Sequence, residues 1–515
     1  MDGEKECVVI VDYGSQYTQL IARRVREKHV FSRIVPCGAP ISAVSCGNLR
    51  GVILSGGPNS VFAEGAPGVD QAVFKLGVPV LGICYGMQLM GQALGGSVEP
   101  GTAREYGSTQ VDVSDSDGLF DGLPKSMTVW MSHGDRVSEI PPGFKAVASS
   151  SNCRVVAMCD AERRLYAIQF HPEVAHTQYG GEMLSNFLFK ICRCKGDWQL
   201  SSWIDQTVRA LKDRIGNDEV LLGLSGGVDS SVVAALLGRA IGPRLHCIFV
   251  DNGLLRWREA DEIRAMFGGR FNLDLHVVSA AGRFYKALAG VTEPEAKRKA
   301  VGREFIEVFA EEARKFGSCR FLAQGTISPD VVESSSAAGA VSHTIKSHHD
   351  VGGLPADLKF ELVEPLRDLF KDEVRIVGRA LGLDAEFIER QPFPGPGLSV
   401  RILGEVTAEK VRLLQQADVR VQEEIRKLPG CRSIWQSFAV LLPVRTVGVM
   451  GDCRTYEHVC AIRCVDSQDA MTADWTRLPY ETLAEISRRI TNEVRGINRV
   501  VYDITSKPPS TIEWE

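Results

Sequence analysis

One cysteine, Cys84, stands in a sequence context that favours a catalytic nucleophile. It follows the apolar run VPVLGI, is flanked by Gly82 and Gly86, and precedes a segment with helical spacing. This is the G-x-nucleophile-x-G pattern of a sharp strand-to-helix turn, with Cys where hydrolases have Ser. Partial positive charge at the start of the helix favours the thiolate. The alternative is a buried structural cysteine beside glycines that are needed for packing.

A second segment supplies the other groups that a cysteine nucleophile needs. The strand-like run YAIQF leads into His171 and, two residues later, Glu173. A histidine at a strand end can accept the thiol proton, and a nearby carboxylate can fix its tautomer and stabilise the imidazolium. Ser55–Pro58, after the run GVIL, could offer backbone N–H groups to a developing oxyanion, or could be an ordinary turn. Together these segments predict a nucleophile, a base and an orienting acid.

The stretches SGGP, GICYGMQ, MSHGD and QFHPE resemble the class I glutamine amidotransferases, and the resemblance covers roughly residues 7–195. It implies that Cys84 attacks the side-chain amide of glutamine, that His171 is general base and acid, and that Glu173 orients His171. The products would be glutamate and ammonia. The resemblance also implies an oxyanion hole and a glutamine-binding loop at 132–135, with the residues Gly57, Tyr85, Gln88, Ser132, His133, Gly134 and Asp135. His133 taken alone could instead be a capping or core histidine.

A second site is predicted at SGGVDSS, residues 225–231, between the apolar run 220–224 and the helical segment VVAALLGRAI. A glycine loop that aims N–H groups from a helix start is an anion site, and the serines could add hydroxyl donors. No Lys follows the glycines and no G-x-G-x-x-G occurs here, so neither a Walker loop nor a dinucleotide fingerprint fits. Asp229 suits a phosphate site only if it caps the helix or meets a magnesium ion. A plain glycine turn with a Ser/Asp cap is the alternative.

SGGVDSS resembles the loop of the ATP pyrophosphatases, which cleave ATP to AMP and pyrophosphate while adenylating a substrate oxygen. The resemblance implies ATP as substrate, with Mg²⁺, which Asp229 could contact. The sequence assigns no other metal ligand. The histidine pair in IKSHHDVGG (345–353) lacks other ligands at zinc spacing and suits a lid over phosphates better. The implied ATP-binding residues are Ser225, Gly226, Gly227, Val228, Asp229, Ser230, Ser231, Val250, Gly325 and Lys371.

The order of these segments, with QPFPGPGL, LPVRTVGVMGD and KPPSTIEWE, resembles the glutamine-hydrolysing GMP synthetase family nearly end to end. The resemblance implies amination of XMP to GMP through an adenylyl-XMP intermediate, with glutamine, ATP and XMP as substrates and a homodimer formed by the C-terminal domain. The implied XMP-binding residues are Arg303, Gln436, Lys507, Ile512 and Glu513. Two alternatives are another glutamine-dependent ATP pyrophosphatase, such as an NAD synthetase, and a binding protein on an inactive amidotransferase scaffold.

These sites require strands that end in glycine-rich loops, and the sequence has them. The runs CVVIVDYGSQ, RGVILSGGP, VPVLGICYG and RLYAIQFHPE read as buried parallel strands, with helical spacing at 19–27 and 202–215. We therefore expect an α/β fold, with two doubly wound parallel-sheet domains followed by a small α+β C-terminal domain. The expected boundaries are 1–198 for the amidotransferase domain, 199–390 for the ATP pyrophosphatase domain and 391–515 for the XMP-binding and dimerisation domain.

Composition narrows the class of protein further. A chain of 515 residues exceeds the roughly 250–300 residues at which one core stops growing, so several domains are expected. A net charge of -5 argues against a nucleic-acid partner. The uncharged segment 76–98 contains Pro79 and several glycines, so we expect no membrane span. Fourteen scattered cysteines without a C-x-x-C pair or a leader favour reduced thiols in the cytoplasm.

Overall fold

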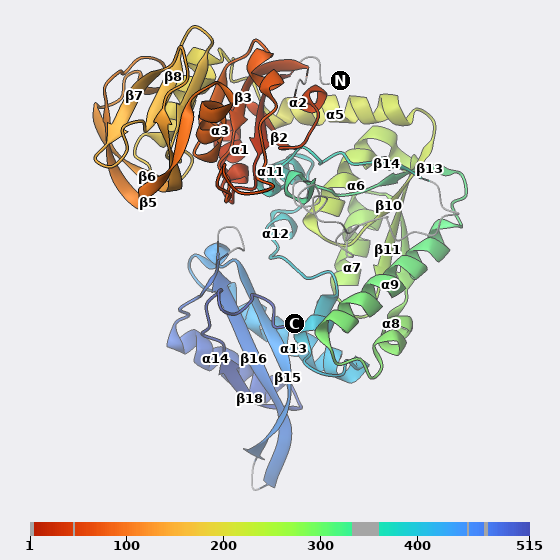
Figure 1. The fold of residues 1–515 in the computed structure, drawn as a ribbon. Coiled ribbons are helices and arrows are strands. Elements are labelled where there is room, and N and C mark those ends of the chain that lie inside the picture. Colours follow the sequence, from red (N-terminus) through yellow and green to blue (C-terminus); the bar gives the residue numbers. More distant parts are fainter. Residues whose placement is uncertain (1–4, 45–46, 332–359, 451–452, 468–471) are drawn as a thin grey trace. The chain divides into compact units, whose positions relative to one another are not determined.

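The computed structural model describes residues 5–44, 47–331, 360–450, 453–467 and 472–515, and the chain forms two compact units (Figure 1). The first unit extends to Gln206 and includes Asp368–Phe370. The second contains Thr207–Thr326 and Lys371–Glu515. The loop with the predicted histidine pair, 345–353, lies outside the described residues.

The first unit is built on a mixed sheet with the strand order β2-β1-β3-β4-β9-β8-β7-β5-β6. Strands β1 to β4 and β9 are parallel, as the buried apolar runs predict. Their bounds are Glu6–Asp12 (β1), Phe31–Pro36 (β2), Asn48–Leu54 (β3), Val80–Ile83 (β4) and Leu165–Ile168 (β9). The helices are Thr18–Glu27 (α1), Ile41–Val44 (α2), Tyr85–Ala93 (α3) and Gly180–Ser185 (α4), followed by a π-helix at Asn186–Ile191.

The other half of this sheet is antiparallel, which the sequence interpretation did not include. It consists of Ser97–Val113 (β5), Ser126–Glu139 (β6), Lys145–Ser150 (β7) and Ala157–Asp160 (β8). Buried residues alternate with more exposed ones along β6, the pattern of a strand with one face on the core. The parallel α/β part of the prediction is confirmed. The antiparallel part was not predicted, and its strand β6 contributes backbone atoms to the site described below.

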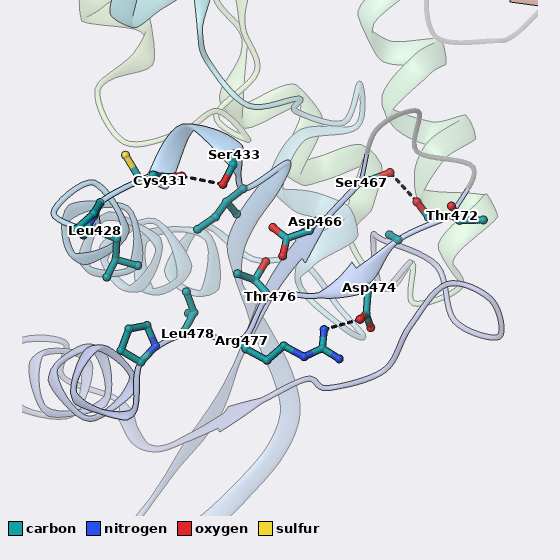
Figure 2. A pocket seen from close by; sticks show the side chains of 15 residues that line it. Leu428, Cys431, Ser433, Asp466, Ser467, Thr472, Asp474, Thr476, Arg477 and Leu478 are labelled. Carbon is teal, nitrogen blue, oxygen red and sulfur yellow. Dashed lines mark hydrogen bonds and ion pairs between the residues drawn. The ribbon is translucent and has the colours of Figure 1, made fainter. Parts of the chain in front are cut away.

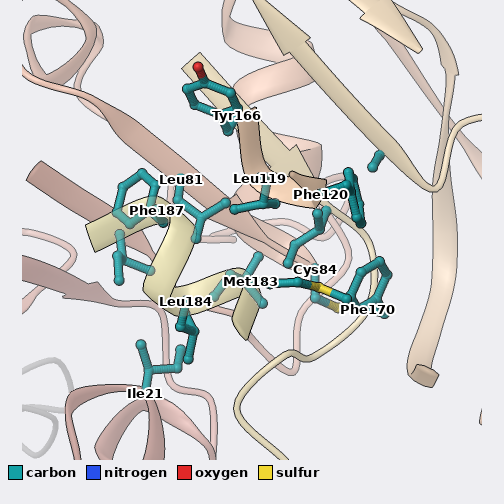
Figure 3. Close-up of a cluster of buried hydrophobic side chains, with 14 of the residues drawn as sticks. Ile21, Leu81, Cys84, Leu119, Phe120, Tyr166, Phe170, Met183, Leu184 and Phe187 are labelled. Atoms are coloured by element: carbon teal, nitrogen blue, oxygen red, sulfur yellow. The ribbon is translucent and has the colours of Figure 1, made fainter. Parts of the chain in front are cut away.

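A large apolar cluster supports the middle of the first unit (Figure 3). Cys84 belongs to it, and its labelled members in the figure also include Ile21, Leu81, Leu119, Phe120, Tyr166, Phe170, Met183, Leu184 and Phe187. Phe170 comes directly before His171 and is fully buried. Because close-packed side chains of this kind rarely rearrange, the cluster holds the backbone at Cys84 and His171 in place.

The second unit contains the predicted parallel sheet, with the order β12-β11-β10-β13-β14. The strands are Glu219–Gly223 (β10), Leu245–Asp251 (β11), Asp274–Ser279 (β12), Cys319–Ala323 (β13) and Glu361–Val363 (β14). The helices that accompany it are Val228–Ile241 (α6), Glu259–Ile263 (α7), Ala281–Leu288 (α8), Pro294–Ala313 (α9), Lys371–Ala380 (α11) and Ala385–Ile388 (α12). The helix α5, Leu200–Ile215, begins close to where the sequence predicts it, near residue 202.

The C-terminal part of the second unit is α+β, as expected. Its sheet combines Gln436–Met450 (β15), Cys453–Asp466 (β16), Asp474–Trp475 (β17) and Ile497–Tyr502 (β18), and its helices are Ala408–Ile425 (α13) and Tyr480–Glu493 (α14). One apolar cluster contains residues from both sides of position 390, for example Leu221, Ile248 and Leu414. The boundary at 390/391 therefore stays a prediction, because the two parts share a core.

Two further features bear on the class of protein. No helix within the described ranges is both long enough and apolar enough to cross a membrane. The cysteines in those ranges are free thiols, and most of them are buried.

Candidate active sites

Cys84 lies in a sharp turn between strand β4 and helix α3. Its backbone has φ +52° and ψ -106°, a conformation that costs energy for any residue with a Cβ. The neighbouring glycines are required because a Cβ at Gly82 would lie 2.7 Å from the Gly86 carbonyl oxygen, and one at Gly86 would lie 2.3 Å from the Leu54 carbonyl oxygen. The Cys84 amide donates to the Ile168 carbonyl oxygen at 2.8 Å, which ties the turn to β9. The predicted nucleophile turn is present.

His171 and Glu173 meet Cys84 as predicted. His171 Nδ1 and Glu173 Oε1 are 2.7 Å apart, and both His171 and Cys84 border Gly56, within 3.0 and 3.7 Å of its built Cβ. Both residues are buried, with 3% of His171 and 1% of Glu173 exposed. Burial lowers the pKa of His171, but the Glu173 carboxylate and the Cys84 side chain outweigh it and hold the pKa well above its usual value. The arrangement favours a protonated His171 beside Cys84, and such an imidazolium can stabilise a negative charge on a cysteine nucleophile.

Several residues that sequence reasoning missed complete this site. Gln169 Nε2 lies 3.8 Å from Cys84 Sγ and is fully buried. The Thr177 hydroxyl donates to the His171 carbonyl oxygen at 2.5 Å, and the Tyr17 ring packs edge-on against the His171 ring at 5.1 Å between centroids. Gln169 lies in the QFHPE stretch that carries the family resemblance, so its place beside His171 in the sequence could have identified it as a site residue. No sequence pattern near Thr177 or Tyr17 identifies those two residues as part of the site.

The SGGP loop lies against the triad. A Cβ built on Gly56 would lie 3.0 Å from His171 Cε1 and 3.7 Å from Cys84 Cβ, so the loop backbone borders both side chains. Gly57 borders the Tyr85 ring, 3.2 Å from its built Cβ, and Tyr85 is the first residue of α3. Gly57 and Tyr85 therefore lie beside the nucleophile on the two segments from which the oxyanion hole was predicted.

Residues 132–135 belong to strand β6, so the sequence interpretation of this segment as a loop is wrong. His133 pairs with Glu105 of β5 in the sheet register, and its Nε2 lies 3.1 Å from a Glu105 carboxylate oxygen. The long-range pairing with β5 overrides the turn preference of Ser, Gly and Asp. Strand β6 still reaches the site, since Cys84 Sγ is 3.5 Å from the Ser132 carbonyl oxygen and Gln88 Nε2 donates to the Asp135 carbonyl oxygen at 2.8 Å.

The SGGVDSS loop joins β10 to α6 in the second unit, as predicted. Gly227 is the N-cap of α6, and the Ser225 and Ser230 hydroxyls are 3.0 Å apart at the N-terminus of this helix. The Ser231 hydroxyl donates to the Gly227 carbonyl oxygen at 2.8 Å. Gly226 has φ +79°, a conformation that glycine adopts without strain. The loop thus has the backbone and hydroxyl donors that an anion requires at a helix of fourteen residues.

Asp229 does not cap the helix; it pairs with the predicted phosphate ligand Lys371. Lys371 Nζ lies 2.7 and 2.6 Å from the two Asp229 carboxylate oxygens. Gly325 lies beside the loop, because a Cβ there would be 3.1 Å from the Ser230 amide nitrogen. Val250 is buried near the end of β11, the neighbouring strand. The structure therefore gathers the predicted ATP residues at the carboxyl edge of one sheet, where nucleotides bind in α/β folds.

The predicted XMP residues are brought together only in part. Gln436 Nε2 donates to Glu513 Oε1 at 2.8 Å, and Ile512 packs in a small cluster with Phe438. Lys507 exchanges backbone hydrogen bonds with Ala473, whereas Arg303 is exposed on helix α9.

Buried cations that sequence reasoning missed hold this C-terminal segment. Arg401 donates to both Glu513 oxygens, at 3.0 and 2.8 Å, and stacks over the Phe438 ring at 4.0 Å. Lys297 is fully buried and pairs with Glu515. No local spacing reveals such partners, which are 112 and 218 residues apart in the chain.

An open pocket of about 850 Å³ lies elsewhere in the C-terminal part (Figure 2). Asp466, Asp474 and Arg477 give it polar walls, and Leu428 and Leu478 give it apolar ones. Arg477 pairs with Asp474, and the Ser467 hydroxyl donates to the Thr472 carbonyl oxygen. None of the predicted XMP residues lines it, so we assign this pocket no substrate.

Comparison with known proteins adds an independent line of evidence. The chain matches the family models described as glutamine amidotransferase class-I over residues 9–191, NAD synthase over 199–252, and GMP synthase C terminal domain over 423–514. The GMP synthase [glutamine-hydrolyzing] of Brachyspira hyodysenteriae is 53% identical over 515 residues, 100% of both chains. That of Clostridium novyi is 54% identical over 512 residues, 99% of both. A glutamine amidotransferase structure from Thermotoga maritima is 19% identical, covers 41% of this chain and 86% of its own, and has a TM-score of 0.28.

Proposed function

The chain belongs to the family of glutamine-hydrolysing GMP synthases and uses glutamine and ATP to make GMP, and we propose that Cys84, His171 and Glu173 release the ammonia for this reaction. The observation that carries the proposal is the buried Cys84–His171–Glu173 contact at a strained strand-to-helix turn. An NAD synthetase is not favoured, because that family model matches only 199–252 while the GMP synthase relatives match the whole chain. An inactive scaffold is not favoured either, since the triad is complete.

The triad supports a thioester route. The Cys84 thiolate attacks the side-chain carbonyl carbon of glutamine, and the proton on His171 passes to the leaving nitrogen, which departs as ammonia. Water, deprotonated by His171, then attacks the thioester carbon and releases glutamate and the Cys84 thiolate. We assign stabilisation of the oxyanion in both steps to the Gly57 and Tyr85 amides, which border the nucleophile, and glutamine binding to Gln88 and residues 132–135.

We assign activation of XMP to the SGGVDSS loop. Its N–H and hydroxyl donors suit the pyrophosphate of ATP, and Lys371 adds a cation beside it. The XMP oxygen takes the adenylyl group, pyrophosphate leaves, and ammonia later displaces AMP. Magnesium bound with ATP would neutralise phosphate charge, and the Asp229 carboxylate offers the hard oxygen ligand that this ion prefers. Gln436, Glu513 and Ile512 form the part of the proposed XMP contact set that the structure brings together; Arg303 and Lys507 complete the set by resemblance.

Cys84→Ala tests this assignment. Glutamine-dependent GMP synthesis should fall to background, whereas synthesis from ammonium salts should persist at a rate within about twofold of the parent, because the adenylating residues are untouched. The measurement is GMP formation with each nitrogen donor, and Cys153→Ala, another buried cysteine of the first unit, is the control. Loss of both activities in a folded Cys84→Ala protein would contradict the proposed separation of roles.

We also propose a homodimer built on β15 and β16. Val447 and Tyr456 are register partners on the same face of this pair, and Val449 follows two residues later. They are 49%, 63% and 75% exposed, so this two-stranded arm exposes three apolar side chains to solvent, beside Arg454, the register partner of Val449. An exposed apolar patch of this kind is typical of an interface, and a twofold axis uses each contact twice.

Val449→Lys tests the dimer. The dissociation constant measured by analytical ultracentrifugation should rise by about tenfold or more, because the substitution places two charges in the interface. Phe62→Lys, which changes an exposed apolar residue of the first unit, should leave it unchanged. A parent chain that sediments as a monomer at all concentrations would overturn the proposal.

Two coarser assignments complete the proposed function. We place the domain boundaries at 1–198, 199–390 and 391–515, which respects the ranges of the three family matches. We place the protein in the reducing cytoplasm, which suits a reactive thiol such as Cys84 and the free cysteines around it.

A further inference from the structure

A group of metal-binding residue types lies at the amino edge of the parallel sheet in the second unit. Glu219 is the first residue of β10, His246 is the second of β11, Asp274 opens β12 and Cys319 opens β13. The SGGVDSS loop follows the opposite end of β10, so this group is separate from the ATP residues. Nothing in the proposed reaction uses it.

The sheet order places β11, β10 and β13 side by side, so the strands that carry these residues are neighbours (Figure 1). Glu219 is the register partner of Cys319, next to a register shift between their strands, and His246 is the partner of Asp274. His246 also pairs with Leu221, which is two residues after Glu219 on the same strand. Because side chains alternate along a strand, Glu219 and His246 point to the same side.

Three of these side chains converge as a metal site requires. The donor atoms of Glu219, His246 and Cys319 all lie within 4.8 Å of one another, and His246 Nε2 is 3.7 Å from Glu219 Oε2. A tetrahedral zinc ion with bonds of about 2.0–2.3 Å would hold such donors about 3.5 Å apart. Small side-chain movements would therefore close the site. The Glu219 oxygen also accepts from the Ser318 hydroxyl, and a carboxylate oxygen has a second lone pair for a metal.

The orientation of His246 is the second, independent observation. Its Nδ1 lies 2.5 Å from Asp274 Oδ2, and the Phe316 ring stacks on it at 4.9 Å between centroids. Its Nε2 is buried and makes no hydrogen bond within the described ranges. When Nδ1–H donates to a carboxylate, Nε2 carries the lone pair, and this carboxylate–histidine arrangement is the one that metal-binding histidines use. The unpartnered Nε2 points to a ligand.

We propose that Glu219, His246 and Cys319 bind a divalent transition metal of the zinc class, with Asp274 as the positioning residue for His246. A mixed N, S and O donor set suits Zn²⁺ better than Mg²⁺ or Ca²⁺, which prefer oxygen alone. The ion would join the starts of three adjacent strands and leave one position to water. Its role is to stabilise the sheet, since no proposed substrate residue touches it.

The test is metal binding by the full-length protein after removal of metals with a chelator. Co²⁺ alone is titrated and followed by its visible bands and the thiolate-to-cobalt charge-transfer band, and bound Zn²⁺ is counted by elemental analysis after gel filtration. His246→Gln and Cys319→Ser should each lose one equivalent of metal and the charge-transfer band relative to the parent. His176→Gln in the first unit and Cys247→Ser on β11 are controls outside the proposed ligand set and should retain both.

Other thiols in the chain could bind metal, so the difference between variants is the decisive quantity. A parent protein without bound metal, or His246→Gln and Cys319→Ser variants with the parent stoichiometry and spectrum, would overturn the proposal. Since Cys319 is buried, its variant could fold poorly; Glu219→Gln keeps the size of a partly exposed side chain and gives a third test. The thermal midpoint of the parent should rise with added Zn²⁺, and that of Glu219→Gln should not.

Discussion

The Glu173 carboxylate influences His171, the base proposed for Cys84, through its buried negative charge. One of its oxygens is 2.7 Å from His171 Nδ1, and the other, Oε2, is buried without a hydrogen-bond donor in the described residues. A carboxylate that is buried with one free oxygen exerts a strong potential, because little water screens it. This potential, together with the Cys84 side chain, is the physical source of the raised pKa of His171.

Glu173→Gln should therefore change the pH dependence of Cys84 alkylation, because a charged imidazole lies beside the thiol. Without the carboxylate, His171 loses its proton at lower pH. The step in the iodoacetamide alkylation rate that follows the charge of His171, measured by peptide mass spectrometry across pH, should move to lower pH. Glutamine hydrolysis should fall by roughly 10²–10⁴-fold.

Glu182→Gln provides the comparison, because it removes an exposed carboxylate from helix α4 of the same unit. It should leave both the alkylation profile and the hydrolysis rate as in the parent. An alkylation profile that Glu173→Gln leaves unchanged would mean that His171 owes its raised pKa to another group.

At the scale of elements, the β4–α3 turn depends on the absence of a side chain at Gly86. A methyl group there would lie 2.3 Å from the Leu54 carbonyl oxygen and 2.8 Å from Leu54 Cβ. Gly86→Ala should therefore push α3 away from β3, destabilise the first unit by about 1–3 kcal/mol and abolish glutamine hydrolysis. The calorimetric transition of the parent and variant measures the first effect. Gly68→Ala, with no atom within 4 Å of its built Cβ, should be neutral, and an equally stable and active Gly86→Ala would disprove this account.

The parallel strands and their loops could be predicted because the signals are local. Apolar runs of four to seven residues that end in glycine turns mark β1, β3, β4 and β10 in the sequence itself. The antiparallel half of the first sheet could not be predicted in this way. His133 is in a strand only because β5 supplies Glu105 as its partner 28 residues away. Arg401 with Glu513, and His246 with Asp274, likewise become neighbours only through the folded topology.

At the scale of the whole molecule, the residues proposed for the two reactions lie in different compact units. Cys84 lies in the first and Asp229 in the second. The two proposed reactions need different environments. Glutamine hydrolysis uses water as a reactant. Adenylyl transfer needs positive charge beside phosphates, and its product is lost if water instead of ammonia attacks the carbon that bears the adenylyl group. Separate units allow each site its own solvent and charge environment within one chain of net charge -5.

Asp229→Ala should reduce pyrophosphate release and leave glutamine hydrolysis unchanged. It removes the proposed magnesium ligand and the ion pair that holds Lys371 at the loop, so pyrophosphate release should fall by about 10²-fold or more. Glutamine hydrolysis measured without ATP and XMP should stay within about twofold of the parent, because the triad is intact. Asp213→Ala, an exposed carboxylate on α5, should change neither rate. Pyrophosphate release at the parent rate would contradict the role of the loop, and loss of both rates in a folded variant would mean that the two units do not work independently.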